Sequence, residues 1–108
     1  MVGKIYLSKI FFTDLYGFKI RTVLIIKEYK DDDVLYVPLT TNMNLGGITI
    51  SENDLENGAL RKNSVAIIPK VSIIHKNFLI KDIGALKQEI MKKIQHELCK
   101  SLGCFADL

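Results

Sequence analysis

The residues best placed to do chemistry stand at the ends of two apolar strands expected in the first half of the chain. Arg21 opens the most hydrophobic expected strand, which runs to Ile26, and Thr40, Thr41 and Asn42 directly follow the next strand. If the two strands pair as an antiparallel hairpin, Arg21 and Thr40 become neighbours. An arginine fork beside a hydroxyl can hold a phosphate through charge-assisted hydrogen bonds. An exposed arginine beside loop threonines, with no function, explains the same pattern.

Other catalytic and metal-binding patterns are absent from the sequence. It contains no phosphate-binding glycine loop, no HExxH and no GxSxG. Cys99 and Cys104 lie five positions apart with no second pair to complete a zinc site, so we interpret them as reduced structural thiols. The acids cluster in the expected turn 31–33 rather than on rigid elements, which argues against a metal-dependent nuclease. We therefore predict no metal and no cofactor.

The net charge of +3 hides an uneven distribution. Residues 1–30 hold six Lys or Arg against two acids, residues 31–58 hold six acids and no base, and residues 59–108 hold nine bases against four acids. If the fold brings the two basic segments together, they form a face that attracts phosphate. Scattered lysines that only keep the surface soluble are the simpler interpretation.

The size and composition of the chain predict one ordinary globular domain, residues 1–108. The 108 residues are 48% hydrophobic and 25% charged, which are typical globular values. No apolar run approaches the roughly 18 residues that a membrane span needs, and the N-terminus lacks the features of a signal peptide. We expect a cytoplasmic protein that does not bind membranes.

Strand signals dominate most of the chain. β-branched and aromatic residues with intervening turn residues predict short strands or extended runs at 4–7, 10–12, 21–26, 34–39, 48–50, 64–68, 71–74 and 78–80. Pro38 cannot donate to a strand ladder, so the strand that contains it should end, bulge or lie on an edge at that point. Asp14–Gly17 has turn chemistry.

Two helical segments are expected. Ser51 followed by Asp54 reads as a helix start, with one or two turns that end at Asn57-Gly58. Leu86–Leu102 carries an apolar residue every fourth position and lysines on the opposite face, which predicts one long terminal helix. The order of elements fits a mostly β fold, a small bent barrel with a C-terminal helix packed on it.

Several segments, in order, resemble the MazF/PemK toxin family. The sequence Gly3-Lys4-Ile5 is similar to the opening of that family, Arg21 to the arginine before its apolar strand, and Pro38-Leu39-Thr40-Thr41 to its Pro-x-Thr-Thr/Ser segment. Later stretches at 60–65, 69–76 and 83–86 resemble its remaining strands and the approach to its helix. The similarity covers nearly the whole chain.

The resemblance implies a fold, an activity and partners. The fold is an SH3-like barrel that forms a two-fold homodimer, and the activity is metal-independent cleavage of single-stranded RNA by 2′-hydroxyl attack, inhibited by a cognate antitoxin protein. The catalytic arginine of the family falls on Arg21 and its catalytic threonine on Thr40, with Thr41 as the other register. We expect the RNA contacts at these residues: Lys19, Thr41, Asn42, Lys70 and His75.

The sequence departs from the family pattern at three places. Thr22 stands where the family has proline after the arginine, the loop before the arginine is shortened to residues 14–19, and Pro69-Lys70 occupies a position that is polar or acidic in many members. His75 is the candidate for proton transfer by residue type, although a surface histidine in a turn, with no function, is the simpler interpretation.

Two other function classes remain open on the sequence alone. One is a toxin of the CcdB kind, which poisons gyrase on the same barrel, but its target contact depends on a C-terminal tryptophan and this chain has no Trp. The other is a non-catalytic SH3-like module that binds peptides through an aromatic groove. Cleavage of long single-stranded RNA in EDTA separates the enzyme from both.

Overall fold

The protein, described by a computed structural model over residues 1–14 and 16–104, is mostly β with one helix near its C-terminus, as the sequence predicts. Leu15, part of the expected turn Asp14–Gly17, lies outside the described residues. The strands are β1 (Lys4–Phe11), β2 (Phe18–Glu28), β3 (Asp33–Thr40), β4 (Ile48–Ile50), β5 (Leu55–Gly58), β6 (Ser64–Ala66), β7 (Ser72–His75) and β8 (Leu79–Leu86). Two 3₁₀ turns, η1 (Glu52–Asp54) and η2 (Lys76–Phe78), and the helix α1 (Gln88–Ser101) complete the described elements.

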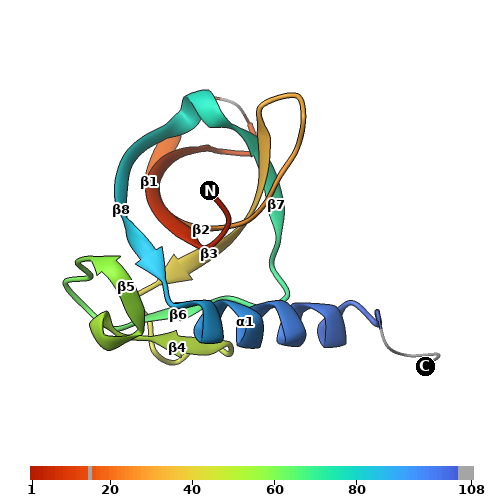
Figure 1. Cartoon of the computed structure of the whole chain (residues 1–108). Coiled ribbons are helices and arrows are strands. Elements are labelled where there is room, and N and C mark those ends of the chain that lie inside the picture. Colours follow the sequence, from red (N-terminus) through yellow and green to blue (C-terminus); the bar gives the residue numbers. More distant parts are fainter. Residues whose placement is uncertain (15, 105–108) are drawn as a thin grey trace.

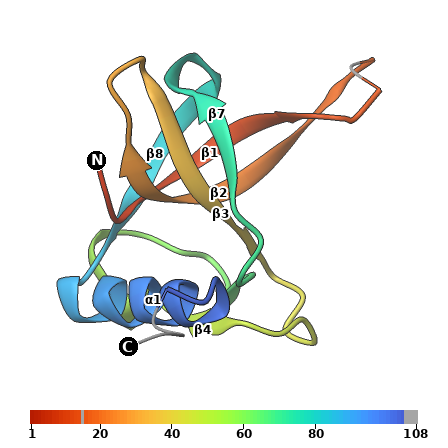
Figure 2. The same cartoon turned by 90° about the vertical axis from the view of Figure 1, so that its right-hand side faces the viewer.

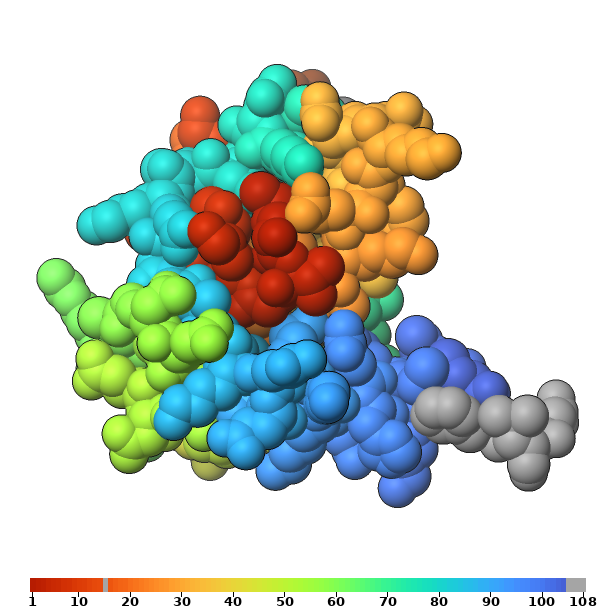
Figure 3. Space-filling view, in the orientation of Figure 1, coloured from red at the N-terminus to blue at the C-terminus, as the bar shows by residue number. Residues whose placement is uncertain are grey.

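The strands form one curled antiparallel sheet in the order β4-β6-β3-β2-β1-β8-β5, and β7 pairs with β3 beside this path. Figure 1 shows β8, β1, β2, β3 and β7 curling around a common centre, with α1 lying across one side. The space-filling view shows the N-terminal residues, in red, filling the mouth of this curl (Figure 3). The expected bent barrel with a terminal helix is therefore confirmed.

The strand β2 lies at the centre of the sheet, as its uninterrupted apolar sequence predicts. Its side chains alternate between two cores. Leu24 joins the helix-side core, which includes Met91, Ile94 and Leu98 of α1, whereas Val23 and Ile25 point into the barrel core with Val34 and Tyr36. Strand alternation therefore decides which face each residue near Arg21 occupies.

Pro38 occupies a place in β3 where its missing N–H is tolerated. On one edge, β3 pairs with β7 up to Tyr36 and with β6 from Leu39 onward, so Pro38 stands at the change of partner. The Pro38 carbonyl still accepts a hydrogen bond from Ile67 N–H at 3.1 Å. The strand therefore continues through Pro38 instead of ending there. Between the last residue paired with β7 and the first paired with β6, β3 needs no backbone N–H donor on that side.

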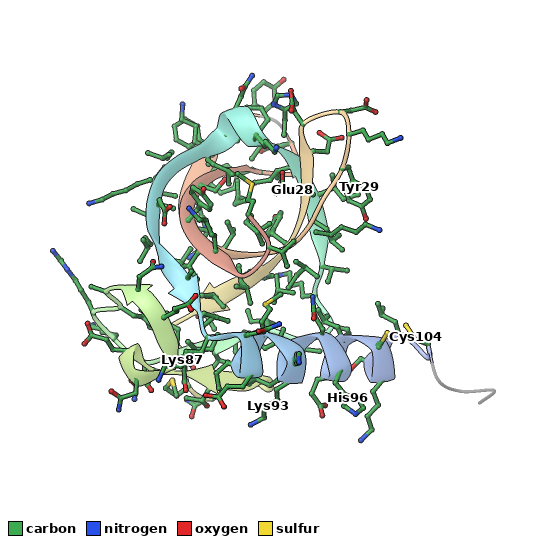
Figure 4. All side chains as sticks on the ribbon, viewed as in Figure 1. Glu28, Tyr29, Lys87, Lys93, His96 and Cys104 are labelled. Atoms are coloured by element: carbon green, nitrogen blue, oxygen red, sulfur yellow. The ribbon has the colours of Figure 1, made fainter. Side chains whose placement is uncertain are left out.

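The terminal helix is shorter than its sequence pattern indicates. It runs from Gln88 to Ser101, and Leu86, the first residue of the predicted stripe, instead ends β8. Met91, Ile94 and Leu98 are buried against the sheet. Lys93 and His96 extend from the side of α1 that faces away from the sheet (Figure 4).

Two other sequence predictions are corrected. The helical turns expected from Ser51 to Asn57 shrink to the three residues of η1, and β5 begins at Leu55 because its backbone pairs with β8. The capping interaction itself is present, since the Ser51 N–H donates to the Asp54 carboxylate at 2.9 Å. The short apolar run at 78–80 is divided between two elements, since Phe78 ends η2 and Leu79 begins the eight-residue strand β8.

The ends of β1 and β2 extend beyond the barrel as a hairpin, here called the arm (residues 9–14 and 16–20, Figure 2). Its outermost strand pair is Phe11–Phe18, and the Phe12 N–H donates to the Gly17 carbonyl at 2.9 Å. Arg21 therefore does not open its strand, as the sequence indicated, but lies three residues inside β2 at the base of the arm.

Candidate active site

The register between β2 and β3 places Arg21 and Thr40 beside each other. Thr22 pairs with Leu39 in the β2–β3 ladder, and one further step along the two strands reaches Arg21 and Thr40. Antiparallel partners have Cα atoms about 5 Å apart and point their side chains to the same face. Arg21 also pairs with Ser8 and Thr40 with Val65, so the two residues sit in a row across four strands.

Arg21 offers its guanidinium to the solvent. The residue is exposed, and no hydrogen bond or ion pair joins its side chain to another residue within the part of the chain that the structure describes. Its strand neighbour across the arm base, Ser8, is fully buried and donates its hydroxyl to the Phe78 carbonyl at 3.0 Å. The strand paired with Arg21 is thus held in place at Ser8, while the Arg21 guanidinium has no partner among the described residues and can bind an anion.

Thr40 is held by the loop that follows it. Its Oγ1 accepts a hydrogen bond from the Asn42 N–H at 3.1 Å, and Asn42 Oδ1 in turn accepts one from the Asn44 N–H at 3.1 Å. These side-chain-to-backbone bonds are typical of turns that start with threonine or asparagine. Because Thr40 Oγ1 serves as acceptor to the loop, its O–H proton remains available to a ligand.

The arm presents a lysine over a phenylalanine on each of its faces. Lys19 Nζ lies 5.4 Å from the ring centroid of Phe12, and Lys9 Nζ lies 5.0 Å from that of Phe18. Lys19 is two residues from Arg21 in the same strand, so this pair shares the face of Arg21, and the Lys9 pair occupies the other face. Lys19 is among the residues predicted from the sequence, whereas Phe12 is not, because its strand-like sequence context gives no sign that the ring is exposed.

A cavity of about 690 Å³ opens on the opposite face of the sheet from Arg21. Thr22 and Thr41, the sequence neighbours of Arg21 and Thr40, both contribute to its wall. The remaining lining residues come from β1, β6, β8 and the segment before β6: Leu7, Ala59, Leu60, Arg61, Lys62, Ser64, Lys81, Asp82 and Ile83. Thr41 thus faces a different space from Thr40, which favours Thr40 as the partner of Arg21.

Of the other expected site residues, Lys70 lies nearer to Thr40 than His75 does. Lys70 is exposed in the loop between β6 and β7, beside the middle of β3. His75 pairs with Asp33 at the opposite end of β3 from Thr40, about 23 Å along the strand at 3.3 Å per residue. Its Nδ1 accepts a hydrogen bond from the Asn77 N–H at 3.1 Å, which gives it a role in capping η2.

Metal-binding clusters and membrane-spanning helices are both absent from the described part of the chain. Within residues 1–14 and 16–104, no three His, Cys, Asp or Glu side chains gather closely enough to hold a metal ion. None of the described helical residues forms a segment with the length and apolar character needed to cross a membrane.

Comparison with known proteins matches this chain to one protein family by sequence and to solved structures by fold. The sequence profile of the PemK-like, MazF-like toxins of type II toxin–antitoxin systems matches residues 7–102. No protein of curated function matches the sequence significantly.

Among solved structures, the fold is similar to a mycobacterial endoribonuclease in complex with its cognate antitoxin, with 22% identity, a TM-score of 0.68, and 95% of this chain and 92% of that chain covered. It is also similar to the Mycobacterium tuberculosis toxin MazF-mt6, with 20% identity, a TM-score of 0.66, and 92% of this chain and 95% of that chain covered. At these identities the likeness concerns the fold.

Proposed function

The chain belongs to the PemK-like, MazF-like toxin family of type II toxin–antitoxin systems, and we propose that it is a metal-independent endoribonuclease that cleaves single-stranded mRNA. The observation that supports the proposal most is the adjacency of Arg21 and Thr40 in the sheet register, with the guanidinium exposed and unengaged. A site made of one cation and one hydroxyl is sufficient for RNA cleavage, because the ribose 2′-hydroxyl of RNA is itself the nucleophile.

In the proposed reaction, the ribose 2′-oxygen attacks the adjacent phosphorus while the bond from phosphorus to the 5′-oxygen breaks. The 2′-hydroxyl gives up its proton and the departing 5′-oxygen gains one, leaving a 2′,3′-cyclic phosphate and a 5′-hydroxyl. Negative charge builds on the non-bridging oxygens in the transition state. The planar fork of Arg21 matches those oxygens, and the Thr40 hydroxyl donates to one of them. The proposed site does not include His75, which pairs with Asp33 at the other end of β3.

We propose that Lys19 and Lys70, both exposed cations, contribute salt-dependent attraction to the RNA backbone on either side of the site. Asn42 acts by holding the loop against Thr40. We further propose that the protein is a homodimer, that it acts in the cytoplasm, where mRNA is found, and that an antitoxin protein inhibits it by occupying the RNA site.

The direct test is incubation of purified protein with long single-stranded RNA in EDTA, followed by mapping of the cut ends. Wild-type protein is expected to cut and to leave cyclic phosphate ends. Arg21→Ala removes one charged donor to the transition state, which typically costs about 3 kcal/mol, a hundredfold or more in rate. Arg21→Lys is also expected to be impaired, since a point charge does not replace a bidentate fork.

Lys9→Ala is the matched control, because it removes one half-buried cation from the opposite face of the arm. It should cut RNA at close to the wild-type rate. Cleavage that requires magnesium, or an Arg21→Ala protein as active as wild type, would show that the proposed mechanism is wrong. A wild-type protein that cuts no RNA of any sequence would point to a non-catalytic binding module instead.

A further inference from the structure

The two faces of the arm carry chemically matched pairs, each a lysine ammonium over an exposed phenylalanine ring, yet only one pair lies on the face of Arg21. Phe12 is 40% exposed and Phe18 is 46% exposed. Phe18 is also packed edge-on against Phe11, at 5.9 Å between ring centroids, and Phe11 packs against Phe78 at 5.0 Å. The Phe18 ring therefore belongs to a small aromatic cluster, and Phe12 is not among the rings of that cluster.

One side of the Phe12 ring is supported by the backbone of the arm. A methyl group built on Gly17 would approach the ring edge to 3.3 Å, so the absence of a side chain at Gly17 lets the ring lie close to the chain. The Phe12 N–H also donates to the Gly17 carbonyl, which fixes this end of the arm. The ring is thus placed by a close backbone approach.

The cation over the Phe12 ring, Lys19, belongs to a side chain that can change its conformation easily. Lys19 has a flexible four-carbon stem, and an exposed lysine–phenylalanine contact is weaker than stacking of a nucleobase on an aromatic ring. Lys19 and Arg21 stand two residues apart on one face, about 7 Å along β2. Two cations at this spacing match successive phosphates of an extended single strand.

We propose that Phe12 is the stacking platform for a nucleobase next to the scissile phosphate. When RNA binds, the base takes the ring face and the Lys19 ammonium turns from the ring to the adjoining phosphate, while Arg21 and Thr40 hold the phosphate that reacts. Alternating aromatic and basic side chains are the common means of holding single-stranded nucleic acid without duplex structure. The inference rests on the proposed function and adds a base-binding position to the same site.

The test measures binding of an RNA that wild-type protein is first shown to cut, made uncleavable by a 2′-deoxy sugar at the attacking nucleotide. The dissociation constant is compared for wild type, Phe12→Leu, Phe12→Trp and the matched control Phe18→Leu. Phe12→Leu should bind about tenfold more weakly. Phe12→Trp should bind at least as well as wild type, and Phe18→Leu should stay within about twofold.

A second arm of the experiment separates stacking from a structural effect. The same RNA is prepared with an abasic residue at the nucleotide on either side of the cut in turn. One of these two RNAs should bind wild type and Phe12→Leu equally, because the partner base of the ring has been removed. A structural effect would weaken Phe18→Leu at least as much, since Phe18 has more packing to lose.

Equal effects of the two leucine variants, or a Phe12→Leu defect that persists with both abasic RNAs, would overturn the inference. A Phe12→Leu protein that binds RNA normally but no longer binds an inhibitory protein would also overturn it, and would assign the ring to a protein contact. These outcomes differ from failure of the proposed function, in which wild-type protein itself neither cuts nor binds single-stranded RNA.

Discussion

Thr40 Oγ1 accepts a hydrogen bond from the Asn42 N–H at 3.1 Å, which ties the hydroxyl proposed for catalysis to the loop behind it. Thr40→Ser keeps both the acceptor and the O–H, so it should retain much of the RNA-cleaving activity. Thr40→Val keeps the shape and loses both, and loss of such hydrogen bonds typically costs about 1–3 kcal/mol, which is about fivefold to more than a hundredfold in rate. The measurement is the single-turnover cleavage rate of one RNA.

The neighbouring threonine supplies the control for this series. Thr41 is exposed and lines the cavity on the other face of the sheet, so Thr41→Val should cut RNA at close to the wild-type rate. If Thr41→Val loses more activity than Thr40→Val, the alternative register of the catalytic threonine is the right one.

The sequence predicts those elements that are determined by residues close together along the chain. The four-residue repeat of apolar side chains in α1 and the continuous apolar run of β2 depend on neighbours along the chain, and both were found. The proximity of Arg21 and Thr40 also follows from one local assumption, that consecutive strands pair as a hairpin. The β2–β3 register satisfies it.

The elements that the sequence does not predict depend on distant partners. β5 forms because its backbone pairs with β8, at residues 26 to 31 positions further on, and this pairing overrides the helical signal of Ser51 and Asp54. The place of His75 at the far end of β3 is likewise decided by β7 pairing with β3 across a long interval. No pattern near His75 indicates that separation, nor does any pattern near Phe12 indicate an exposed ring.

Gly84 should be intolerant of any side chain because β5 crosses directly over it. A methyl group at Gly84 would come within 2.5 Å of the Asn57 carbonyl oxygen, which is backbone and not free to move away. Overpacking of this kind costs about 2 kcal/mol, or roughly 10 °C in Tm for a domain of this size. Thermal unfolding of Gly84→Ala measures it.

Gly46 is the matched control, since a methyl group there meets no atom within 4 Å. Gly46→Ala should unfold within a few degrees of wild type. Equal Tm values for the two alanine variants would show that β5 and β8 are not in the close contact described here.

The carboxylate of Glu28 should make folding stability sensitive to acid. The Lys76 ammonium donates to it at 2.9 Å and the N-terminal ammonium lies 3.2 Å away, and together they hold the pKa of Glu28 below its ordinary value of 4.5. Glu28 is labelled in Figure 4. A depressed pKa in the folded state stabilises the protein above the unfolded pKa, and this stabilisation is lost as the pH falls through the folded pKa.

The measurement is Tm between pH 3 and pH 7 for wild type and Glu28→Gln. Wild type should be the more stable at pH 6 to 7, and the difference should shrink as the pH falls below about 4.5. Glu97→Gln serves as a control on the helix. A difference between wild type and Glu28→Gln that grows in acid would contradict the assigned ion pairs.

The proposed homodimer should involve the loop that follows Thr40. Met43 and Leu45 in this loop are 47% and 43% exposed, and exposed apolar side chains that gather beside a site are typical of surfaces covered by a partner. We expect a dimer by light scattering at micromolar concentration. Leu45→Glu places a charge in the interface and should shift the protein toward monomer.

Ile73→Glu is the matched control, because Ile73 is 55% exposed but lies on β7, near the opposite end of β3 from this loop. It should remain a dimer. A monomeric wild type would contradict the proposed assembly altogether, whereas a dimer broken by Ile73→Glu and kept by Leu45→Glu would move the interface to the β7 side. In the latter case the partner subunit would lie far from Thr40, and each protomer would have to bind and cut RNA with its own residues alone.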